Sequence, residues 1–258
     1  MNFDKIRHIP LIAIAICLLL TATRAEAAAR LKNETLHYVI SYKWGLIHKD
    51  AGEATLSLRN SGPNYKVTLT AKTKPWADKI YMVRDTLLGQ IRANGLVPLS
   101  YQKITNENGK YDRDEIHYGH SGGTTTGTVK RYKLRDGQWK IRNKTLTATG
   151  PVYDMLSVFY YLRQLDYSQL NKNKIYTATV FSGSKKEKIS IRSLGKTKIK
   201  LKNGSVREAY HIKFKFTQDG GKKSSDDMDS WISTDAAHIP LYLVGKLPVG
   251  EVRCYFVG

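Results

Sequence analysis

The sequence predicts a mainly β, antiparallel protein with one main α-helix packed on its curved sheet. Three observations predict this class. Runs rich in aromatic and β-branched residues alternate with Gly, Asn, Asp and Pro turn signals along most of the chain. A single segment changes from a two-residue period to a helical one. The hydrophobic content of 41% in 258 residues is ordinary for a globular protein, which allows one large domain or two small ones.

The N-terminal 27 residues have the pattern of a secretory signal peptide. Lys5 and Arg7 precede an apolar run, Pro10–Ala22, and Ala25-Glu26-Ala27 fits the small-x-small cleavage pattern. The run is shorter than the roughly 20 residues that cross a bilayer. We therefore expect cleavage near Ala27, a single β-rich domain over residues 28–258, and a location in the periplasm or cell envelope of a bacterium.

Cysteine usage agrees with a fold held by its core. Cys17 belongs to the predicted signal peptide, and Ile16 before it is too large for a lipoprotein cleavage site. Cys254 is then the single cysteine of the mature chain, so no internal disulfide can form. It lies in a predicted terminal strand, where we expect a buried thiol that behaves as a small apolar side chain.

The charge of the chain is unusual. The formal net charge is +20, and cleavage removes three basic and two acidic residues, so the mature protein keeps +19. Such basicity suits anionic partners or solubility. Because an exported protein seldom meets nucleic acid, and because no known nucleic-acid-binding module is present, we expect no nucleic-acid partner.

Strand signals follow one another along the first half of the mature chain. Turn clusters such as Ser61-Gly62-Pro63-Asn64 separate them, and alternating apolar and polar residues mark half-buried strands. No repeat of fixed period and no linker divides the chain. The expected strands are Leu36–Trp44, Glu53–Asn60, Tyr65–Lys72, Ser100–Asn106, Asp114–His120, Thr126–Leu134 and Gln138–Leu146.

The segment Gly150–Leu170 predicts the main helix. Pro151 marks its start, and Asp154 can cap its first turn. An apolar stripe at helical spacing predicts the face that packs on the sheet. The stripe consists of Met155, Leu156, Phe159 and Leu162, with Val158 and Leu165 in looser positions.

A hairpin is predicted around Asn203-Gly204, a two-residue turn signal between two alternating runs. This turn would pair Lys202 with Ser205 and Leu201 with Val206. It would also pair Lys200 with Arg207, and Lys198 with Ala209. One face would then carry Ile199, Leu201, Val206, Tyr210, Ile212 and Phe214. The other would carry Lys198, Lys200, Lys202, Arg207, His211 and Lys213.

The alternation of these lysines comes from folding, but their uniform charge does not. Like charges side by side on a sheet repel one another, and Thr or Glu would serve as well on a solvated face. The lysines are therefore either the solvent side of the sheet, with protection against edge-to-edge aggregation as one role, or a surface that faces an anion.

Motifs for catalysis and metal binding are weak. Gly119–Gly123 reads Gly-His-Ser-Gly-Gly, but a nucleophile elbow needs a helix after the serine, and here a loop and a strand follow. His117 and His120 are three residues apart on an expected strand and would point to opposite faces. The acidic segment 224–231 lacks the glycine and the distant glutamate of a calcium loop. We therefore expect no catalytic residue, no metal and no cofactor.

Three stretches together resemble a bacterial exported family catalogued as domain of unknown function 3108. They are the opening hairpin YVISYKWGLIHKDAGEATLSL, the helix Tyr153–Arg163, and the ending Asp229–Phe256. The resemblance implies a single spiral β-roll with one main helix, and no agreed activity. The positions that match its motifs are Asp154, Ser157, Tyr160, Tyr161, Arg163, Trp231, Ser233, Asp235 and Pro240.

These motif residues have an architectural interpretation. Asp154 would cap the helix, and Arg163 would pair with a carboxylate or with carbonyl groups near the sheet. Trp231 would fill core, and Asp235 would shape the turn before Pro240.

Three functions are consistent with the sequence: a binding module, a hydrolase, and an interaction protein that supports an assembly. The favoured one is a non-enzymatic module that binds or carries an envelope lipid, lipopolysaccharide or glycan, with peripheral membrane contact, because basic groups and 16 tyrosines suit such ligands. It requires a concave apolar pocket between helix and sheet. The candidate ligand-binding residues are Lys198, Lys200, Lys202, Arg207, Tyr160, Tyr161, Arg163, Trp231 and Asp235.

The alternative is a hydrolase of envelope glycans or lipids. It would use Asp154 with Asp235, or Ser121 with His117 or His120, and it requires two such groups within hydrogen-bond reach in one cleft.

Overall fold

The computed structural model describes residues 31–258 except 168, 171–172, 222–224 and 247–249. The predicted signal peptide, residues 1–27, lies outside the described residues. Residues 31–258 form one compact unit. In the described part of the chain, no helix is both long and apolar enough to cross a membrane.

The unit is built on one sheet of 15 strands, which confirms the mainly β prediction. Neighbouring strands are antiparallel except β9 and β10, and the order is β8-β7-β6-β5-β4-β3-β2-β1-β15-β14-β13-β12-β11-β10-β9. The first eight strands are β1 Glu34–Trp44, β2 Ile47–Ser61, β3 Asn64–Thr73, β4 Arg84–Arg92, β5 Val97–Glu107, β6 Lys110–Ser121, β7 Thr124–Arg135 and β8 Gln138–Thr149. The others are β9 Val152–Tyr153, β10 Ile175–Phe181, β11 Lys186–Lys200, β12 Val206–Gln218, β13 Met228–Ser233, β14 Pro240–Lys246 and β15 Glu251–Phe256.

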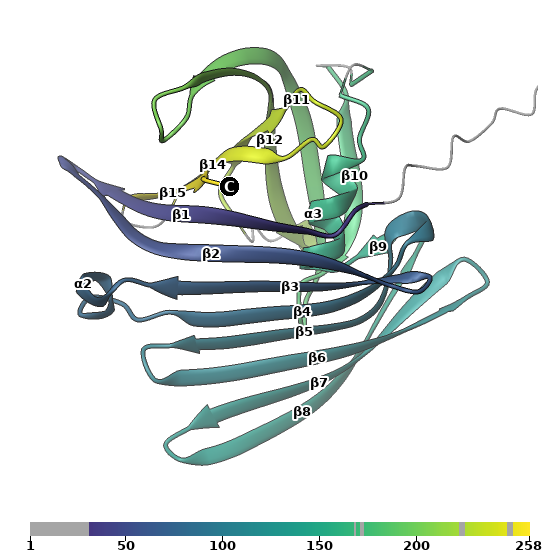
Figure 1. The fold of residues 1–258 in the computed structure, drawn as a ribbon. Helices are drawn as coiled ribbons and strands as arrows, with labels where there is room; N and C mark the ends of the chain where they lie inside the picture. Colours follow the sequence, from purple (N-terminus) through teal and green to yellow (C-terminus); the bar gives the residue numbers. More distant parts are fainter. Residues whose placement is uncertain (1–30, 168, 171–172, 222–224, 247–249) are drawn as a thin grey trace, which may run out of the picture. The chain divides into compact units, whose positions relative to one another are not determined.

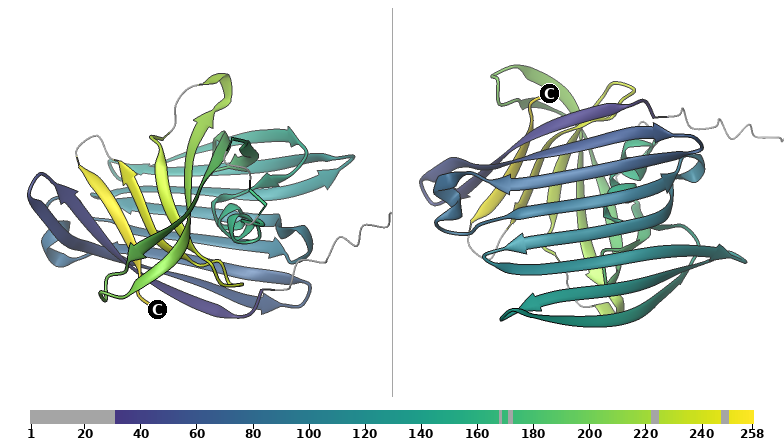
Figure 2. Two further views of the ribbon diagram at one scale, coloured as in Figure 1. Left: turned by 90° about the horizontal axis from the view of Figure 1, so that it is seen from above. Right: turned by 60° about the horizontal axis from the view of Figure 1, so that its bottom comes forward.

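The sheet curls until it is nearly closed as a barrel. The strands β1 to β8 form a broad curved wall, and the strands β9 to β15 fold back over its concave side (Figures 1 and 2). The C-terminal strand β15 pairs with β1, so the two ends of the described chain meet inside the sheet. The sheet has two edges, β8 and β9. We call the concave side of the sheet its inner face.

Two α-helices occur among the described residues, α2 Pro75–Asp78 and α3 Met155–Arg163, together with the 3-10 turns η1 Asn94–Leu96 and η2 Asp219–Gly221. The longer helix, α3, lies on the inner face and contacts β4, β9 and β10 (Figure 1). Its buried Leu156, Val158 and Tyr160 belong to the main core, which also includes residues from both halves of the sheet. The prediction of one main helix on a curved sheet is therefore confirmed.

The helix is shorter than the predicted segment Gly150–Leu170. Asp154 has extended backbone angles and is the N-cap, while the preceding Val152–Tyr153 forms β9. At the other end, the side chains of Tyr167 and His238 bind the carbonyl groups of Leu162 and Arg163. These side chains satisfy the last free carbonyl groups, so the chain can leave the helix there.

The predicted apolar stripe is also too narrow. Val158 and Tyr160 are as buried as Leu156, whereas Met155, Phe159 and Leu162 are only partly buried. A helix enclosed by a curled sheet has core on several sides, and a single stripe describes a helix that lies on an open surface.

The hairpin of β11 and β12 has a different register from the predicted one. Its loop has three residues, Lys202–Gly204, because the Leu201 amide donates to the Ser205 carbonyl (2.8 Å) and Gly204 takes a positive φ of 86°. This is the three-residue hairpin loop with glycine in the left-handed region, so the expected two-residue turn is wrong. The pairs are now Lys200 with Val206, and Lys198 with Glu208.

The one-residue shift moves side chains to other faces. Ile199 lies opposite Arg207 and shares its face with Ala209, while Val206 is 62% exposed. Leu201 and Ala209 form a small second core with Leu241, apart from the main one. A bulge between Ser193 and Gly195 separates this part of the hairpin from the part that faces the main core. The predicted alternation is therefore right, and the predicted grouping of Ile199 and Leu201 with Ile212 and Phe214 is wrong.

Candidate functional site

The inward-facing side chains become smaller along the sheet, from α3 towards α2. On β2, Leu58 and Leu56 belong to the core, and the next inward positions are Ala54 and Gly52. The paired positions of β3 are Val67, Leu69, Ala71 and Thr73 in the same direction. Because a Cβ atom on Gly52 would lie 2.6 Å from the carbonyl oxygen of Lys72, only glycine fits there. The decrease in side-chain size leaves space on the inner face at the α2 end.

The connection between β3 and β4 lies over this space. It contains α2, a single turn that begins with Pro75, where the missing amide donor costs nothing. The indole Nε1 of Trp76 donates to the carbonyl oxygen of Asp50 on β2 (2.9 Å), and the Lys74 amide donates to the Ala51 carbonyl (2.8 Å). The segment is thus fixed to β2 by main-chain acceptors.

Between this segment and the sheet lies a cavity of about 770 Å³, which we call the α2 pocket. Its lining is almost entirely apolar. The residues come from β1, β2, β3 and β15 and from the α2 segment: Ile40, Tyr42, Ala51, Gly52, Ala71, Lys72, Thr73, Trp76, Ala77, Ile80, Tyr81, Val83 and Val252.

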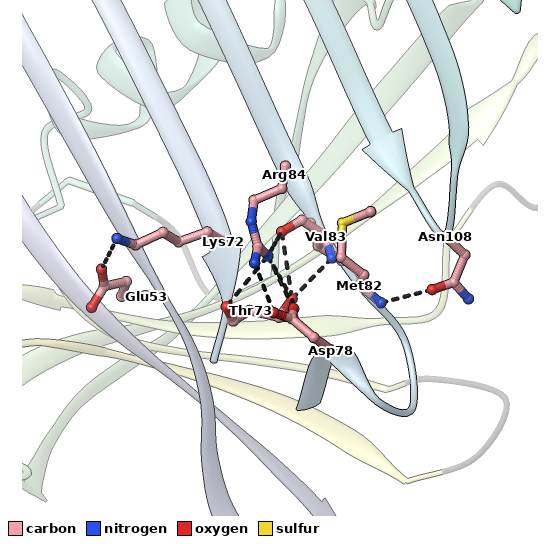
Figure 3. A network of polar contacts seen from close by, with 8 residues as sticks. All are labelled: Glu53, Lys72, Thr73, Asp78, Met82, Val83, Arg84 and Asn108. Carbon is pink, nitrogen blue, oxygen red and sulfur yellow. Dashed lines mark hydrogen bonds and ion pairs between the residues drawn. The ribbon is translucent and has the colours of Figure 1, made fainter. Parts of the chain in front are cut away.

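A polar network holds the α2 segment at its far end (Figure 3). The Arg84 guanidinium binds the Asp78 carboxylate (2.7 Å), and the Thr73 hydroxyl donates to the same carboxylate. The Val83 amide donates to the Thr73 hydroxyl (2.9 Å). The bonds from Arg84 and Thr73 lower the pKa of Asp78 below its ordinary value. Asp78 therefore stays ionised at neutral pH and keeps the segment bound to β3 and β4.

Three lysines lie beside the α2 segment that covers the pocket. The Lys49 ammonium lies 4.6 Å from the ring centroid of Trp76, and Lys74 and Lys79 flank α2 in sequence. Among the described residues, no carboxylate forms an ion pair with these three lysines. We call Lys49, Lys74 and Lys79 the rim lysines.

Asp50 lies beside the rim but already has a cation. Burial raises its pKa, but hydrogen bonds from Lys202 (2.6 Å) and Ser41 (2.6 Å) outweigh burial and lower the pKa overall. The rim therefore keeps an excess of positive charge.

Exposed apolar side chains lie at the same end of the sheet. Ile80, which lines the pocket, is 74% exposed, and Tyr81 next to it is also exposed. Trp44 and Leu46, at the turn between β1 and β2, are exposed as well. This turn and α2 lie at the same side of the sheet in Figure 1.

The predicted lysine row does not line the pocket. Lys198 and Lys200 are exposed on the β11–β12 hairpin, and Arg207 borders a smaller cavity of about 270 Å³ with Leu201 and Phe256. Lys202 differs from the others. It binds Asp50 and lies 5.2 Å from the Tyr255 ring, so through Asp50 it is connected to Trp76 in the pocket wall.

The other predicted site residues are spread over three places. Tyr160 is buried in the core, and Tyr161 stacks on Tyr153. Arg163 is buried, binds the Glu34 carboxylate, and donates to the Ala237 carbonyl (3.0 Å).

Trp231 and Asp235 occupy structural positions as well. Trp231 stacks between His211 and Tyr242 in an aromatic row that continues to Tyr255. The Asp235 carboxylate accepts from the Ser233 hydroxyl (2.9 Å) and the Ala237 amide (3.0 Å), as expected for a residue that shapes the turn before Pro240.

Asp154 caps α3 as predicted. One carboxylate oxygen accepts from the amides of Leu156 (2.8 Å) and Ser157 (2.7 Å), and the Asp154 amide donates to the Ser157 hydroxyl (2.8 Å), which completes a capping box. The other carboxylate oxygen is buried without a partner among the described residues. Burial is the main cause that raises the pKa of Asp154 to about 6.

The pairs required for a hydrolase do not come together. Asp154 lies at the start of α3 and the Asp235 turn at its end, and nine residues at a rise of 1.5 Å separate them by about 13 Å. His120 binds the Pro98 carbonyl (2.9 Å) and the Thr125 hydroxyl (3.1 Å) through its two ring nitrogens, so neither is free for Ser121. His117 and Ser121 lie four residues apart on β6, which separates their backbones by about 13 Å. Within the described ranges, no three potential metal ligands gather.

The space between the main helix and the sheet, where the pocket was predicted, is filled by core side chains, so that prediction was wrong. Sequence reasoning missed the α2 pocket. Four helical residues are too few for a periodic signal, and the pocket joins strands from both ends of the chain. One local signal was present: the inward positions Gly52, Ala54 and Ala71 are small within strands that otherwise carry large apolar residues.

The fold and the pocket define a class: a mainly β, barrel-like domain with an apolar pocket under a short helix. A crystal structure of a β-barrel-like protein of domain of unknown function DUF1849 from Brucella abortus has the same fold, with a TM-score of 0.61 and 13% sequence identity. The match covers 88% of this chain and 97% of that one. At this identity the likeness shows the fold alone.

The family follows from the sequence. The chain belongs to the family described as protein of unknown function (DUF3108), whose sequence model matches residues 37–257. This confirms the resemblance in the opening hairpin, the helix and the C-terminal segment. No curated protein matches the chain.

Proposed function

We propose that the domain is a non-enzymatic binding module that holds the apolar part of an anionic envelope amphiphile, a lipid or a lipopolysaccharide, in the α2 pocket. The observation that carries the proposal is the pocket itself. Its volume of about 770 Å³ lies within the range of roughly 300–1,000 Å³ typical of small-molecule sites. The apolar lining favours a hydrocarbon chain over a glycan, which would need polar partners.

The charge around the pocket supports an anionic headgroup. The rim lysines form no ion pair with a carboxylate among the described residues, and the whole chain carries a net charge of +20. A chain in the pocket would place its headgroup at the rim, where Lys49, Lys74 and Lys79 can neutralise it.

Two further features support a place at the envelope. The N-terminal signal-peptide pattern supports export, with cleavage near Ala27. The exposed Trp44, Leu46, Ile80 and Tyr81 lie near the rim lysines, and apolar side chains together with lysines suit peripheral contact with an anionic membrane surface. Such contact would let a ligand pass between the bilayer and the pocket.

The binding test uses a dansyl-labelled fatty acid, whose fluorescence rises in apolar surroundings. We expect the purified domain to bind it, and Ala71→Trp, which fills the pocket, to weaken binding about tenfold or more. A tenfold loss equals about 1.4 kcal/mol, and burying two methylene groups is worth roughly that amount. The matched control is Thr70→Trp, which places the same side chain on the opposite face of the same strand.

Two outcomes would contradict the proposal: no binding by the unchanged protein, or an equal loss in Ala71→Trp and Thr70→Trp. If the domain binds the probe as expected, mass spectrometry of protein taken from the native envelope would identify the natural ligand. We expect a lipid or lipopolysaccharide that is absent from the Ala71→Trp variant.

A further inference from the structure

The edge strand β8 leaves part of its backbone without a neighbour. It is the first strand in the sheet order and, among the described residues, pairs with β7 alone. Its second half is partly covered, because the Lys144 ammonium binds the Ser184 carbonyl (3.0 Å) and the Lys186 ammonium binds the Thr147 carbonyl (3.2 Å). Residues 138–143 are all exposed, and we call them the free edge. A free edge presents unpaired amide and carbonyl groups that another strand can bind.

The inner face of the free edge is cationic. Lys140 lies opposite Lys133 on β7, and Arg142 lies opposite Arg131. Like charges in these positions are destabilising. Lys133 and Arg131 have carboxylate partners on β6, whereas Lys140 and Arg142 have none among the described residues.

The outer face of the free edge is apolar. Trp139 is 54% exposed and Ile141 is 53% exposed. The Trp139 ring meets the Tyr111 ring edge to face, with 5.7 Å between the centroids. Aromatic and β-branched side chains in adjacent strands stabilise each other across a sheet, so Trp139 and Ile141 offer contacts to one more strand.

We propose that the free edge binds an extended segment of a partner protein that alternates acidic and apolar residues. The segment would add a strand beside β8, with its backbone bound to the free edge. Its carboxylates would face Lys140 and Arg142, and its apolar side chains would face Trp139 and Ile141. Six residues are about the usual length of one strand, so a short segment is enough.

The same side chains disfavour self-association and simple edge protection as the role of the free edge. A second copy of this chain would place Lys140 and Arg142 near their own counterparts, where like charges repel. Lysine and arginine can also protect an edge against aggregation. Protection alone does not account for Trp139 and Ile141, because exposed apolar side chains on an edge promote association.

The test uses three six-residue fluorescent peptides and fluorescence anisotropy. The first alternates glutamate with valine, and the second has the same composition with the three glutamates before the three valines. The third is the alternating peptide with N-methyl groups on every second amide, which removes the hydrogen-bond donors along one edge of the strand. It is made in two versions, one for each edge. We expect the alternating peptide to bind at least tenfold more tightly than the block peptide and more tightly than one of the two methylated versions.

Variants locate the site. The double variant Lys140→Glu and Arg142→Glu should reduce binding of the alternating peptide at least tenfold. The control is Lys188→Glu with Lys215→Glu, two exposed cations on β11 and β12 with the same charge change, which should leave binding unchanged. Circular dichroism checks that both variants are folded.

Three results would overturn the proposal. The first is equal binding of the alternating and block peptides, and the second is an equal loss of peptide binding in both double variants. The third is that the double variant Lys140→Glu and Arg142→Glu loses binding to phosphatidylglycerol vesicles but still binds the alternating peptide as tightly as the unchanged protein. The last result would assign the cations to a membrane surface.

Discussion

The two ends of the inner face use the same alternation of residues with different side-chain sizes. At the α3 end, Leu56, Leu58 and the helix residue Leu156 fill the space between the walls. At the α2 end, Gly52, Ala54 and Ala71 occupy the equivalent inward positions, and a cavity remains. One continuous sheet therefore has a filled core at one end and an open cavity at the other, because the volume of its inward side chains decreases along the strands.

The two helices differ in how they are capped and held. The longer helix α3 has a complete capping box and is surrounded by core. The short helix α2 has no side-chain bond at its N-cap, and it is held by Trp76 and by the Asp78–Arg84 pair at the surface. We therefore expect the α3 end to contribute most of the stability and the α2 end to tolerate changes without loss of the fold.

The largest expected effect tests this division of roles. Leu156→Ala should lower the free energy of unfolding by about 2–5 kcal/mol, because it removes a fully buried side chain that packs against Gly89. Ile80→Ala, at the exposed edge of the α2 pocket, should change it by about 0.5 kcal/mol or less. Urea unfolding measures both. Similar costs at the two sites would mean that the α2 end also carries the fold.

The next effect is a pH dependence of stability that we expect from Asp154 at α3 and not from Asp78 at α2 between about pH 4 and about pH 7.5. The pKa of Asp154 is about 6 in the folded protein, above its ordinary value of 3.8, so between these values the folded state holds a proton that the unfolded state has lost. The contribution of Asp154 to stability is therefore present below pH 3.8 and is lost as the pH rises through about 6. The difference of about two pKa units corresponds to on the order of 3 kcal/mol.

Substitutions separate this effect from the rest of the protein. Urea unfolding at about pH 4 and about pH 7.5 should show Asp154→Asn gaining stability relative to the unchanged protein as the pH rises. The pKa of Asp78 is lowered, so its contribution is lost only as the pH falls through that lowered value, below 3.8. Asp78→Asn should thus differ from the unchanged protein by nearly the same amount at both pH values. A flat profile for Asp154→Asn would contradict the buried, protonated carboxyl.

The smallest expected effect concerns the attachment of α2. Arg84→Ala breaks a solvent-screened pair with Asp78, so the midpoint of thermal unfolding should stay almost unchanged. Limited trypsin digestion should nevertheless cleave faster after Lys79, because the segment loses its far anchor. The control is Arg192→Ala, an exposed arginine on β11. Equal cleavage rates in the two variants would show that the bonds of Trp76, Lys74 and Thr73 hold the segment without Arg84.

Local patterns predicted much of the fold. Alternation located seven of the first eight strands and missed β4, Arg84–Arg92, and Asp154 was placed correctly as the cap of the main helix. Both features depend on neighbours in sequence. The helix length was wrong because its end depends on His238, 75 residues away from Arg163.

Register and site depend on information that residue patterns lack. The hairpin around Asn203 differs from the predicted one by a single residue in its loop, and both loops have glycine in the turn. The α2 pocket needs Ile40 and Val252 from opposite ends of the chain. Of the predicted ligand-binding residues, Lys202 alone reaches the pocket wall, through Asp50.

The bulge at Gly195 has an evolutionary consequence. Because strand side chains alternate, one inserted or deleted residue near this position would exchange the sides of Lys196, Lys198, Thr197 and Ile199 together. A lineage could thus redistribute the charge of a whole hairpin in a single genetic event, without altering any codon for those residues. Length variation at this point, more than substitution, is the change to look for when relatives acquire different surface chemistry.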